Sequence, residues 1–305
     1  MTVAVIDIGT NTILLLVAAV SPDGTIQPLV YEQRIPRLGQ GVDARRRLHP
    51  DSMQRAVNVL IDYREMIRQF SPARTAVIGT SAIRDAENRQ AFADLVSSRT
   101  GFTLEVLSGE EEAALTYRGA ISGIPGIQRA TVVDIGGGST EITAGAAGMI
   151  TSSCSLNIGS VRLTERFVRS DPPRREEMDS LSSCIDEALD GVHPTPDASS
   201  TLVAVAGTAT TLALLAKGYT EFSLGAVSGA TLEAQEVVSV AENLSGMSVS
   251  DILQRGSYMP GRADVITAGA FILRAIMRRF GFPRVIVSER GVRYGVALRE
   301  RERAG

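Results

Sequence analysis

Two stretches of the chain break into short apolar runs separated by tight polar turns, the pattern of an antiparallel β-meander. The first covers residues 3–32, where the apolar run 13–20 is followed by the turn Ser21-Pro22-Asp23-Gly24. The second covers residues 130–154. Short apolar runs rich in β-branched residues and bounded by Gly, Pro and Asp are typical of strands. The sequence therefore predicts two meanders.

Between and after these meanders, apolar residues recur either at helical spacing or in short buried runs. Helices are expected at residues 51–70, 88–98, 176–189, 232–244, 271–280 and 292–303, and strands at 75–79, 103–107, 202–206 and 285–287. Asp51 is the expected N-cap of the first of these helices, and Ser71-Pro72 its end. Strands separated by helical segments predict an α/β fold with partly parallel sheets.

A glycine-rich sequence, Asp134-Ile-Gly-Gly-Gly-Ser-Thr-Glu141, follows the first strand of the second meander. Three glycines let the backbone turn tightly, so that several N–H groups converge on one anion. A carboxylate beside such a loop repels phosphate unless a divalent cation lies between them, and Mg²⁺ typically takes one or two carboxylates plus phosphate oxygens. The sequence predicts a phosphate site with a metal at Asp134; a simple glycine turn with a capping Asp is the structural alternative.

The same pattern occurs near the N-terminus, as Asp7-Ile-Gly-Thr-Asn-Thr12, about one domain length earlier. A dinucleotide-binding fold would continue from its glycines into a helix. Here an apolar run and a turn follow, so the loop lies inside a β-hairpin. Two such hairpins are expected to face each other across a cleft and to hold phosphate from both sides.

This pair of hairpins resembles the superfamily of actin, sugar kinases and chaperone ATPases, and the whole chain resembles the exopolyphosphatase and guanosine pentaphosphate phosphatase family. The motifs that carry the family resemblance occur in its order: Asp7-Ile-Gly-Thr-Asn-Thr12, Gly79-Thr-Ser-Ala-Ile-Arg84, Ser108-Gly-Glu-Glu-Glu-Ala113, Asp134-Ile-Gly-Gly-Gly-Ser-Thr-Glu141, Asn157-Ile-Gly-Ser-Val-Arg162, Ala206-Gly-Thr-Ala-Thr-Thr211 and Ser288-Glu-Arg-Gly291.

The resemblance implies an α/β fold of two ribonuclease H-like lobes, as in actin and sugar kinases, with an interlobe cleft. The expected lobes are residues 1–122 and 123–305, and the helix at about 292–305 is expected to pack back on the first lobe, as it often does in the superfamily. The chain resembles the short, two-lobe form of the family.

Three consecutive glutamates, Glu110, Glu111 and Glu112, open the helix that follows Ser108. Ser108 with Glu111 three residues later forms a capping box, and the helix dipole also favours acidic residues in a first turn. Capping accounts fully for Glu111 and partly for the other two, so the residues alone do not identify a functional carboxylate. The resemblance implies that the glutamate directly before Ala113, Glu112, is the catalytic base.

Arg84 follows a strand at its carboxyl end, where open α/β sheets commonly bind ligands, and its planar guanidinium suits phosphate. An ion pair with Asp85 or Glu87 is the structural alternative. Gly207 and Thr208 precede a helix whose N–H groups suit an anion, although Thr208 also suits a simple cap. The expected ligands of Mg²⁺, or of Mn²⁺, are Asp134 and Glu141, and Asp7 is expected to serve the same metal or to position water. The expected phosphate-binding residues are Asp7, Gly9, Thr10, Asn11, Thr12, Arg84, Gly136, Gly137, Gly138, Ser139, Thr140, Gly207 and Thr208.

The composition of the chain argues against some classes of binding partner. A net charge of −3 and a pI near 5.6 argue against a broadly basic surface for nucleic acid. Lys217 is the one lysine, so phosphate recognition depends on arginine, backbone N–H groups and metal. Two histidines and two cysteines give neither a His-based metal site nor a disulfide framework. No apolar run is long enough to span a membrane, and a cytoplasmic homodimer without membrane association is expected.

The resemblance implies an exopolyphosphatase that hydrolyses the terminal phosphoanhydride of inorganic polyphosphate, preferably short chains, or of guanosine pentaphosphate (pppGpp), and releases phosphate. One alternative is an ATP-dependent kinase or ATPase of the same fold. Another is a non-catalytic protein that binds polyphosphate or an alarmone and has no need of Glu112. The sequence does not separate polyphosphate from pppGpp, because both present a terminal phosphoanhydride.

Overall fold

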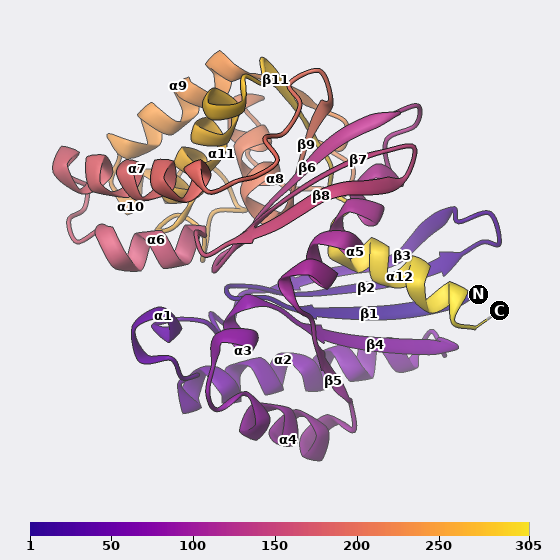
Figure 1. Cartoon of the computed structure of the whole chain (residues 1–305). Helices are drawn as coiled ribbons and strands as arrows, with labels where there is room; N and C mark the ends of the chain where they lie inside the picture. Colours follow the sequence, from indigo (N-terminus) through magenta and orange to yellow (C-terminus); the bar gives the residue numbers. More distant parts are fainter. Residues whose placement is uncertain (305) are drawn as a thin grey trace. The chain divides into compact units, whose positions relative to one another are not determined.

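The computed structural model describes residues 1–304, and the chain forms two compact units (Figure 1). Unit 1 contains residues 1–122 together with the C-terminal segment that begins at Val292. Unit 2 contains Gly123–Gly291. The two ends of the chain therefore belong to the same unit.

The sheet of unit 1 has the order β3-β2-β1-β4-β5. β1 (Thr2–Ile8), β2 (Ile13–Val20) and β3 (Ile26–Arg34) form the predicted meander, while β4 (Arg74–Gly79) and β5 (Leu104–Val106) lie parallel to β1 on its other side. β1 is a nearly continuous apolar run because both faces of the sheet are covered.

Alternate residues of β1 belong to two different cores. Ala4, Ile6 and Ile8 pack with residues of α2 (Pro50–Arg68) and α4 (Arg89–Thr100). Val3 and Val5 pack with residues of α5 (Gly109–Ile121) and α12 (Val292–Glu302) on the opposite face. The short helices α1 (Val42–Arg45) and α3 (Ser81–Asp85) connect these elements.

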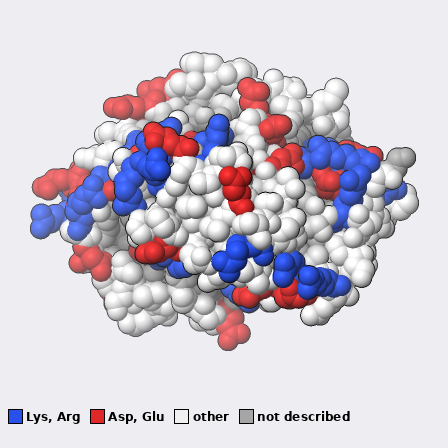
Figure 2. Space-filling model, turned by 90° about the horizontal axis from the view of Figure 1, so that it is seen from below, with Lys and Arg blue, Asp and Glu red and all other residues white. Residues whose placement is uncertain are grey.

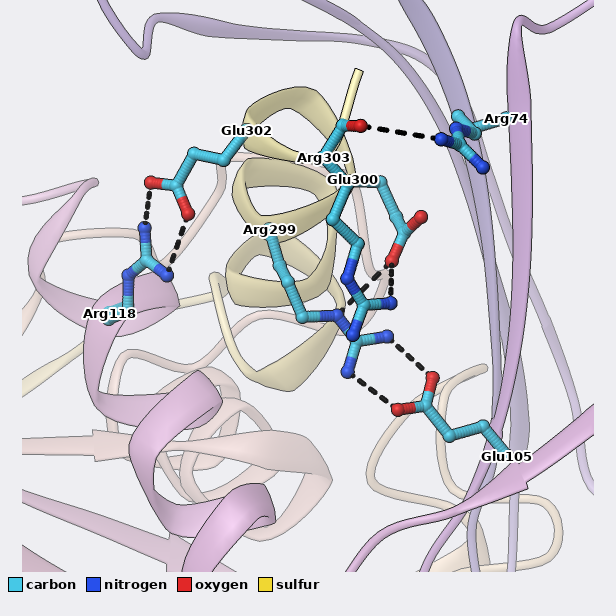
Figure 3. A network of polar contacts seen from close by, with 7 residues as sticks. All are labelled: Arg74, Glu105, Arg118, Arg299, Glu300, Glu302 and Arg303. Carbon is cyan, nitrogen blue, oxygen red and sulfur yellow. Dashed lines mark hydrogen bonds and ion pairs between the residues drawn. The ribbon is translucent and has the colours of Figure 1, made fainter. Parts of the chain in front are cut away.

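Ion pairs and a hydrogen bond join the C-terminal part of α12, and Arg303 just after it, to the rest of unit 1 (Figure 3). Arg299 donates two hydrogen bonds to Glu105 of β5, at 2.8 and 2.6 Å. Arg118 of α5 pairs with Glu302 at 2.5 Å, and Arg74 of β4 donates to the carbonyl of Arg303 at 3.4 Å. Because such partly exposed pairs contribute little each, the buried apolar face of α12 supplies most of its attachment.

The sheet of unit 2 has the order β10-β11-β9-β6-β7-β8. Its meander is β6 (Arg129–Ile135), β7 (Thr140–Ala146) and β8 (Met149–Leu156). Two parallel strands, β9 (Thr201–Val205) and β11 (Arg284–Val287), follow on the other side of β6. Strands β8-β7-β6-β9-β11 thus repeat the order β3-β2-β1-β4-β5, and the predicted α/β fold of two ribonuclease H-like lobes is confirmed.

Helices complete the core of unit 2. They are α6 (Ser160–Phe167), α7 (Arg175–Asp190), α8 (Ala206–Ala216), α9 (Ala234–Ser245), α10 (Val249–Leu253) and α11 (Ile266–Phe280). α11 contacts α6, α7, α8 and α9, and its residues from Ile266 to Leu273 are all buried. This helix therefore supplies a large part of the unit's core.

Two local predictions were wrong. The N-cap of α2 is His49 rather than Asp51, because Pro50, with its fixed φ, occupies the first helical position; the His49 Nδ1 accepts a hydrogen bond from the Asp51 N–H at 3.2 Å. The helix predicted at 232–244 begins later, because Thr231–Glu233 form the short strand β10, in which Leu232 pairs with Val285. Pairing with a neighbouring strand overrides the helical spacing there.

Charged side chains are mixed over the face shown in Figure 2. Lys and Arg lie there in separate groups with Asp and Glu between them, so the described part of this face carries no continuous basic track. Within residues 1–304, no helix has both the length and the apolar character required to cross a bilayer.

We predict that Gly295→Ala destabilises unit 1. A Cβ at position 295 would lie 1.9 Å from the carbonyl oxygen of Leu115, so α12 and α5 would have to separate. The expected loss, from urea unfolding, is about 1–3 kcal/mol. Gly291→Ala is the matched control, because no described atom lies within 4 Å of its added Cβ. Equal unfolding free energies for the two variants would contradict the close helix contact.

Candidate functional site

The two glycine loops form the same turn. In the β1–β2 loop the Gly9 N–H donates to the Thr12 carbonyl at 3.0 Å, and in the β6–β7 loop the Gly136 N–H donates to the Ser139 carbonyl at 3.0 Å. A Cβ on Gly9 would lie 3.1 Å from that Thr12 oxygen, and one on Gly136 would lie 3.2 Å from that of Ser139. A side chain at either position would therefore crowd the carbonyl oxygen that closes the turn.

The carbonyl groups of the second loop are held by the start of α6. The N–H groups of Ser160 and Val161 donate to the carbonyls of Gly136 and Gly137, both at 2.9 Å. Arg162 donates from its N–H to Gly137 at 3.0 Å and from its Nε to Gly138 at 2.6 Å. The motif from Asn157 to Arg162 thus supports the glycine loop from one side.

This support fixes the direction of the loop's N–H groups. In a trans peptide the C=O and the following N–H point in opposite directions. The N–H groups of Gly137, Gly138 and Ser139 therefore point away from α6, as a row of donors suited to an anion. In unit 1 the carbonyls of Thr10 and Asn11 likewise accept from the residue 37–39 segment, at 2.7 and 3.1 Å, which turns the following N–H groups the other way.

Gly207 and Thr208 lie in the first turn of α8, since this helix begins at Ala206 rather than after a loop. The Thr208 hydroxyl donates to the Ile135 carbonyl at 3.0 Å, which places the start of α8 beside the end of β6. Arg262 donates to the carbonyl of Gly207 at 3.3 Å and to the Thr211 hydroxyl at 2.9 Å. Unit 2 thus brings the second glycine loop, Gly207 and Thr208 together.

Asp134 and Glu141 are direct cross-strand partners in the β6–β7 pair. Both are buried, and the Ser155 hydroxyl donates to Glu141 Oε1 at 2.6 Å. Opposed residues of an antiparallel pair share one face, and like charges there are unfavourable. Within residues 1–304, no group of three or more His, Cys, Asp or Glu is arranged so that it could hold a metal ion. Asp134 and Glu141 offer carboxylate oxygens, the kind of ligand that hard divalent cations such as Mg²⁺ prefer.

In unit 1, Arg84 pairs with Glu112 rather than with its sequence neighbours. Arg84 Nη1 donates to Glu112 Oε2 at 2.9 Å and to the Leu107 carbonyl at 3.0 Å. Glu112 is 7% exposed. Burial raises the pKa of its carboxyl above the ordinary value, and the hydrogen bond and charge of Arg84 offset part of this rise. A buried glutamate with a raised pKa has the character of a proton acceptor.

The neighbouring glutamates differ from Glu112. The predicted capping box is confirmed: Glu111 Oε2 accepts from the Ser108 N–H at 2.8 Å, and the Ser108 hydroxyl accepts from the Glu111 N–H at 3.1 Å. These bonds lower the pKa of Glu111. Glu110 and Glu111 are both exposed. Only Glu112 of the three is directed into the unit.

Asp7 is the last residue but one of β1, and its charge interacts with that of Glu112. It is buried, and its Oδ1 has no hydrogen-bond partner among residues 1–304. The pKa of Asp7 is raised to about 7: burial raises it most, attraction to Arg293 lowers it, and repulsion from Glu112 raises it. The Ser81 hydroxyl, also buried, lacks a hydrogen-bond partner in the same described range. Unit 1 thus brings Asp7, Arg84 and Glu112 together at the carboxyl ends of parallel strands.

Arg293 is a site residue that sequence reasoning missed. It lies in the first turn of α12, is 4% exposed, and its positive charge lowers the pKa of Asp7. The available signal was a charged residue flanked by Val292 and Tyr294 in the last helix. Local sequence did not distinguish it from the other arginines of that helix.

The Ppx/GppA phosphatase family model matches residues 16–304. Exopolyphosphatase 2 of Mycobacterium tuberculosis is 37% identical over 315 residues, which cover 97% of each protein. A guanosine-5'-triphosphate,3'-diphosphate pyrophosphatase of Vibrio atlanticus is 29% identical, covering 96% of this chain and 58% of that protein. The crystal structure of the Aquifex aeolicus Ppx/GppA family member has a TM-score of 0.84 at 31% identity, covering 100% of this chain and 99% of that one. The chain therefore belongs to the Ppx/GppA phosphatase family.

Proposed function

We propose that this protein hydrolyses the terminal phosphoanhydride of short inorganic polyphosphate and of pppGpp, releasing orthophosphate. The observation that carries the proposal is the buried Glu112, held by Arg84 beside Asp7 at the ends of β1 and β4. Family relatives named as an exopolyphosphatase and as a pppGpp pyrophosphatase support this substrate class.

Glu112 acts as the general base in this proposal. Its Oε2 is held by Arg84, and its Oε1, outside that contact, takes a proton from the attacking water. The water oxygen bonds to the terminal phosphorus as the bridging P–O bond breaks, and the shortened chain leaves. The hydrogen bonds from Arg84 to Glu112 and to the Leu107 carbonyl both use Nη1, so we assign its Nε and Nη2 to phosphate.

The glycine loops supply backbone donors. In unit 2 we assign the N–H groups of Gly137, Gly138 and Ser139, together with those of the first turn of α8, to phosphate oxygens. Successive N–H groups of a glycine loop and the first N–H groups of a helix are both suited to binding an anion. Asp134 and Glu141 would hold Mg²⁺, or Mn²⁺, which when bound neutralises charge on the phosphate oxygens. Asp7 orients the attacking water.

The burial of Glu112 favours a hydrolase over a non-catalytic binder of polyanions. In a protein that only binds a polyanion, a buried carboxylate would lower the affinity, since its negative charge repels the ligand. A hydrolase needs such a proton acceptor, because proton transfer is efficient when the pKa of the base lies near the working pH. The kinase alternative lacks any comparable supporting observation.

Orthophosphate release tests the proposal directly. Tripolyphosphate, long-chain polyphosphate, pppGpp and ATP are compared as substrates, each with Mg²⁺ and with excess chelator. We expect Mg²⁺-dependent release from tripolyphosphate and pppGpp. Turnover of ATP alone, with the phosphoryl group passed to an acceptor, would instead support a kinase.

We predict that Glu112→Gln lowers kcat by about 10²- to 10⁴-fold, because it removes the base while keeping the shape of the side chain. Glu111→Gln is the matched control and should change kcat little, since Gln also serves in a capping box. Steady-state kinetics on tripolyphosphate and melting curves are measured for both variants. The reverse ranking would show that Glu112 is not the base.

A second prediction concerns the metal. Asp134→Asn removes a negative ligand, so the Mg²⁺ concentration for half-maximal activity should rise at least about tenfold. Asp179→Asn is the control, because the Asp179 side chain is 72% exposed on α7. Mg²⁺ titrations of phosphate release provide the measurement. Full activity of the wild type in excess chelator would exclude a metal role for Asp134.

A third prediction concerns the support of the glycine loop. Gly159→Ala places a Cβ 2.5 Å from the Gly137 carbonyl oxygen and should push the loop away from α6. We expect weaker orthophosphate binding in calorimetry and a loss of stability of about 1–3 kcal/mol. The control Gly246→Ala, whose nearest neighbour would be at 3.7 Å, should change neither. Unchanged phosphate affinity in a folded Gly159→Ala variant would exclude the loop as an anion site.

A further inference from the structure

The hydroxyl of Ser81 is a buried donor to which the proposed mechanism assigns no role. Ser81 is the first residue of α3, two positions after the end of β4. Its side chain is 3% exposed, and its Oγ has no hydrogen-bond partner among residues 1–304. Buried hydroxyl groups are nearly always hydrogen-bonded, because an unsatisfied one costs free energy, so this exception requires an explanation.

Another serine of unit 1 shows what a structural role looks like. Ser52 lies in the first turn of α2 and is also 3% exposed. Its Oγ accepts a hydrogen bond from Arg55 Nη2 at 2.8 Å. Serine at a helix start ordinarily finds such a local partner. Ser81 is buried to the same extent, yet no described group of the protein satisfies its hydroxyl.

Backbone hydrogen bonds place Ser81 at the edge of the sheet that carries the site of unit 1. The Thr80 N–H donates to the Ile8 carbonyl at 3.3 Å, which sets the start of α3 beside the end of β1. The Leu107 N–H donates to the Gly79 carbonyl at 2.9 Å, which brings the segment before α5 to the end of β4. The carboxyl ends of parallel strands are where α/β sheets commonly bind ligands.

Ser81 and Arg84 lie on the same face of α3. The Arg84 N–H donates to the Thr80 carbonyl at 3.0 Å and so closes one helical turn. Residues three positions apart are neighbours on a helix surface. Arg84 uses Nη1 to hold Glu112, and its Nε and Nη2 are assigned to phosphate. A phosphate bound by Arg84 is therefore next to the face of α3 that also carries Ser81.

We propose that Ser81 is a further substrate-binding residue, whose hydroxyl donates a hydrogen bond to an oxygen of the terminal phosphate held by Arg84. The assignment rests on the proposed function and names one more contact of the same site. A neutral hydroxyl binds a phosphate oxygen without adding charge beside Glu112. Binding of the phosphate supplies the partner that the buried hydroxyl lacks in the protein alone.

Stability without ligand provides the first test. Urea unfolding is measured in phosphate-free buffer for wild type, Ser81→Ala and Ser52→Ala. Ser81→Ala breaks no hydrogen bond of the protein, so its folding equilibrium constant should be unchanged or higher. Ser52→Ala makes the same exchange in a first helical turn but removes the partner of Arg55, so its constant should be at least about threefold lower than that of Ser81→Ala. Equal destabilisation of the two variants, or failure of Ser81→Ala to fold, would make the hydroxyl of Ser81 structural and overturn the proposal.

Orthophosphate binding provides the second test and requires no turnover. Hydrogen bonds to charged groups are the stronger ones, so Ser81→Ala should raise the Kd for orthophosphate in calorimetry at least about tenfold. The Kd of Ser52→Ala should match that of the wild type. The same Kd for wild type and Ser81→Ala, or no binding to the wild type, would contradict the assignment.

Kinetics separates this assignment from the proposed function. Ser81→Ala should lower kcat/KM for tripolyphosphate at least about tenfold, while its melting temperature stays at or above that of the wild type. Wild-type kcat/KM in Ser81→Ala would overturn the assignment and leave the proposed function intact. Absence of phosphate release from the wild type would contradict the proposed function, whereas weaker orthophosphate binding by Ser81→Ala would still place the hydroxyl in an anion site.

Discussion

The contact on which the site of unit 1 depends is the ion pair, 2.9 Å long, between the buried Glu112 and the partly buried Arg84. Two charges taken out of water are stable only when they are paired and further hydrogen-bonded, and the bond from Arg84 to the Leu107 carbonyl supplies such a contact. The same guanidinium thereby joins the end of α3 to the start of α5. Loss of Arg84 leaves the buried carboxylate of Glu112 without compensation, so the site depends on this one interaction.

The two glycine loops orient their backbone N–H groups in the same way. Each follows an aspartate at a strand end with a hairpin turn closed by one hydrogen bond from a glycine N–H. A second segment binds the loop's carbonyls, residues 37–39 in unit 1 and the start of α6 in unit 2. Because carbonyl and N–H directions are linked in each peptide, holding one set orients the other. The side chains added to this frame differ, with Arg84 and Glu112 in unit 1 and a pair of carboxylates in unit 2.

Features that depend on residues close in sequence could be predicted. The meanders, both glycine hairpins and the Ser108–Glu111 capping box follow from local pattern, and all three are present. Features that depend on distant residues could not. The sequence left Arg84 with neighbouring acids as possible partners, whereas packing of α5 brings Glu112 to it. Arg293 affects the pKa of Asp7 only because the last helix belongs to unit 1. Burial, which local sequence does not specify, is what separates Glu112 from Glu110 and Glu111.

The measurement that tests the account most directly is the pH dependence of kcat/KM for tripolyphosphate in the wild type and in Arg84→Met. Burial raises the pKa of Glu112 and Arg84 lowers it, so the acid limb should lie above the ordinary range of a glutamate and should move to still higher pH when Arg84 is lost. The position of the limb is independent of any loss in absolute rate. An acid limb at the same pH in both proteins would contradict the claim that the base is Glu112 and that its proton affinity is set by this ion pair.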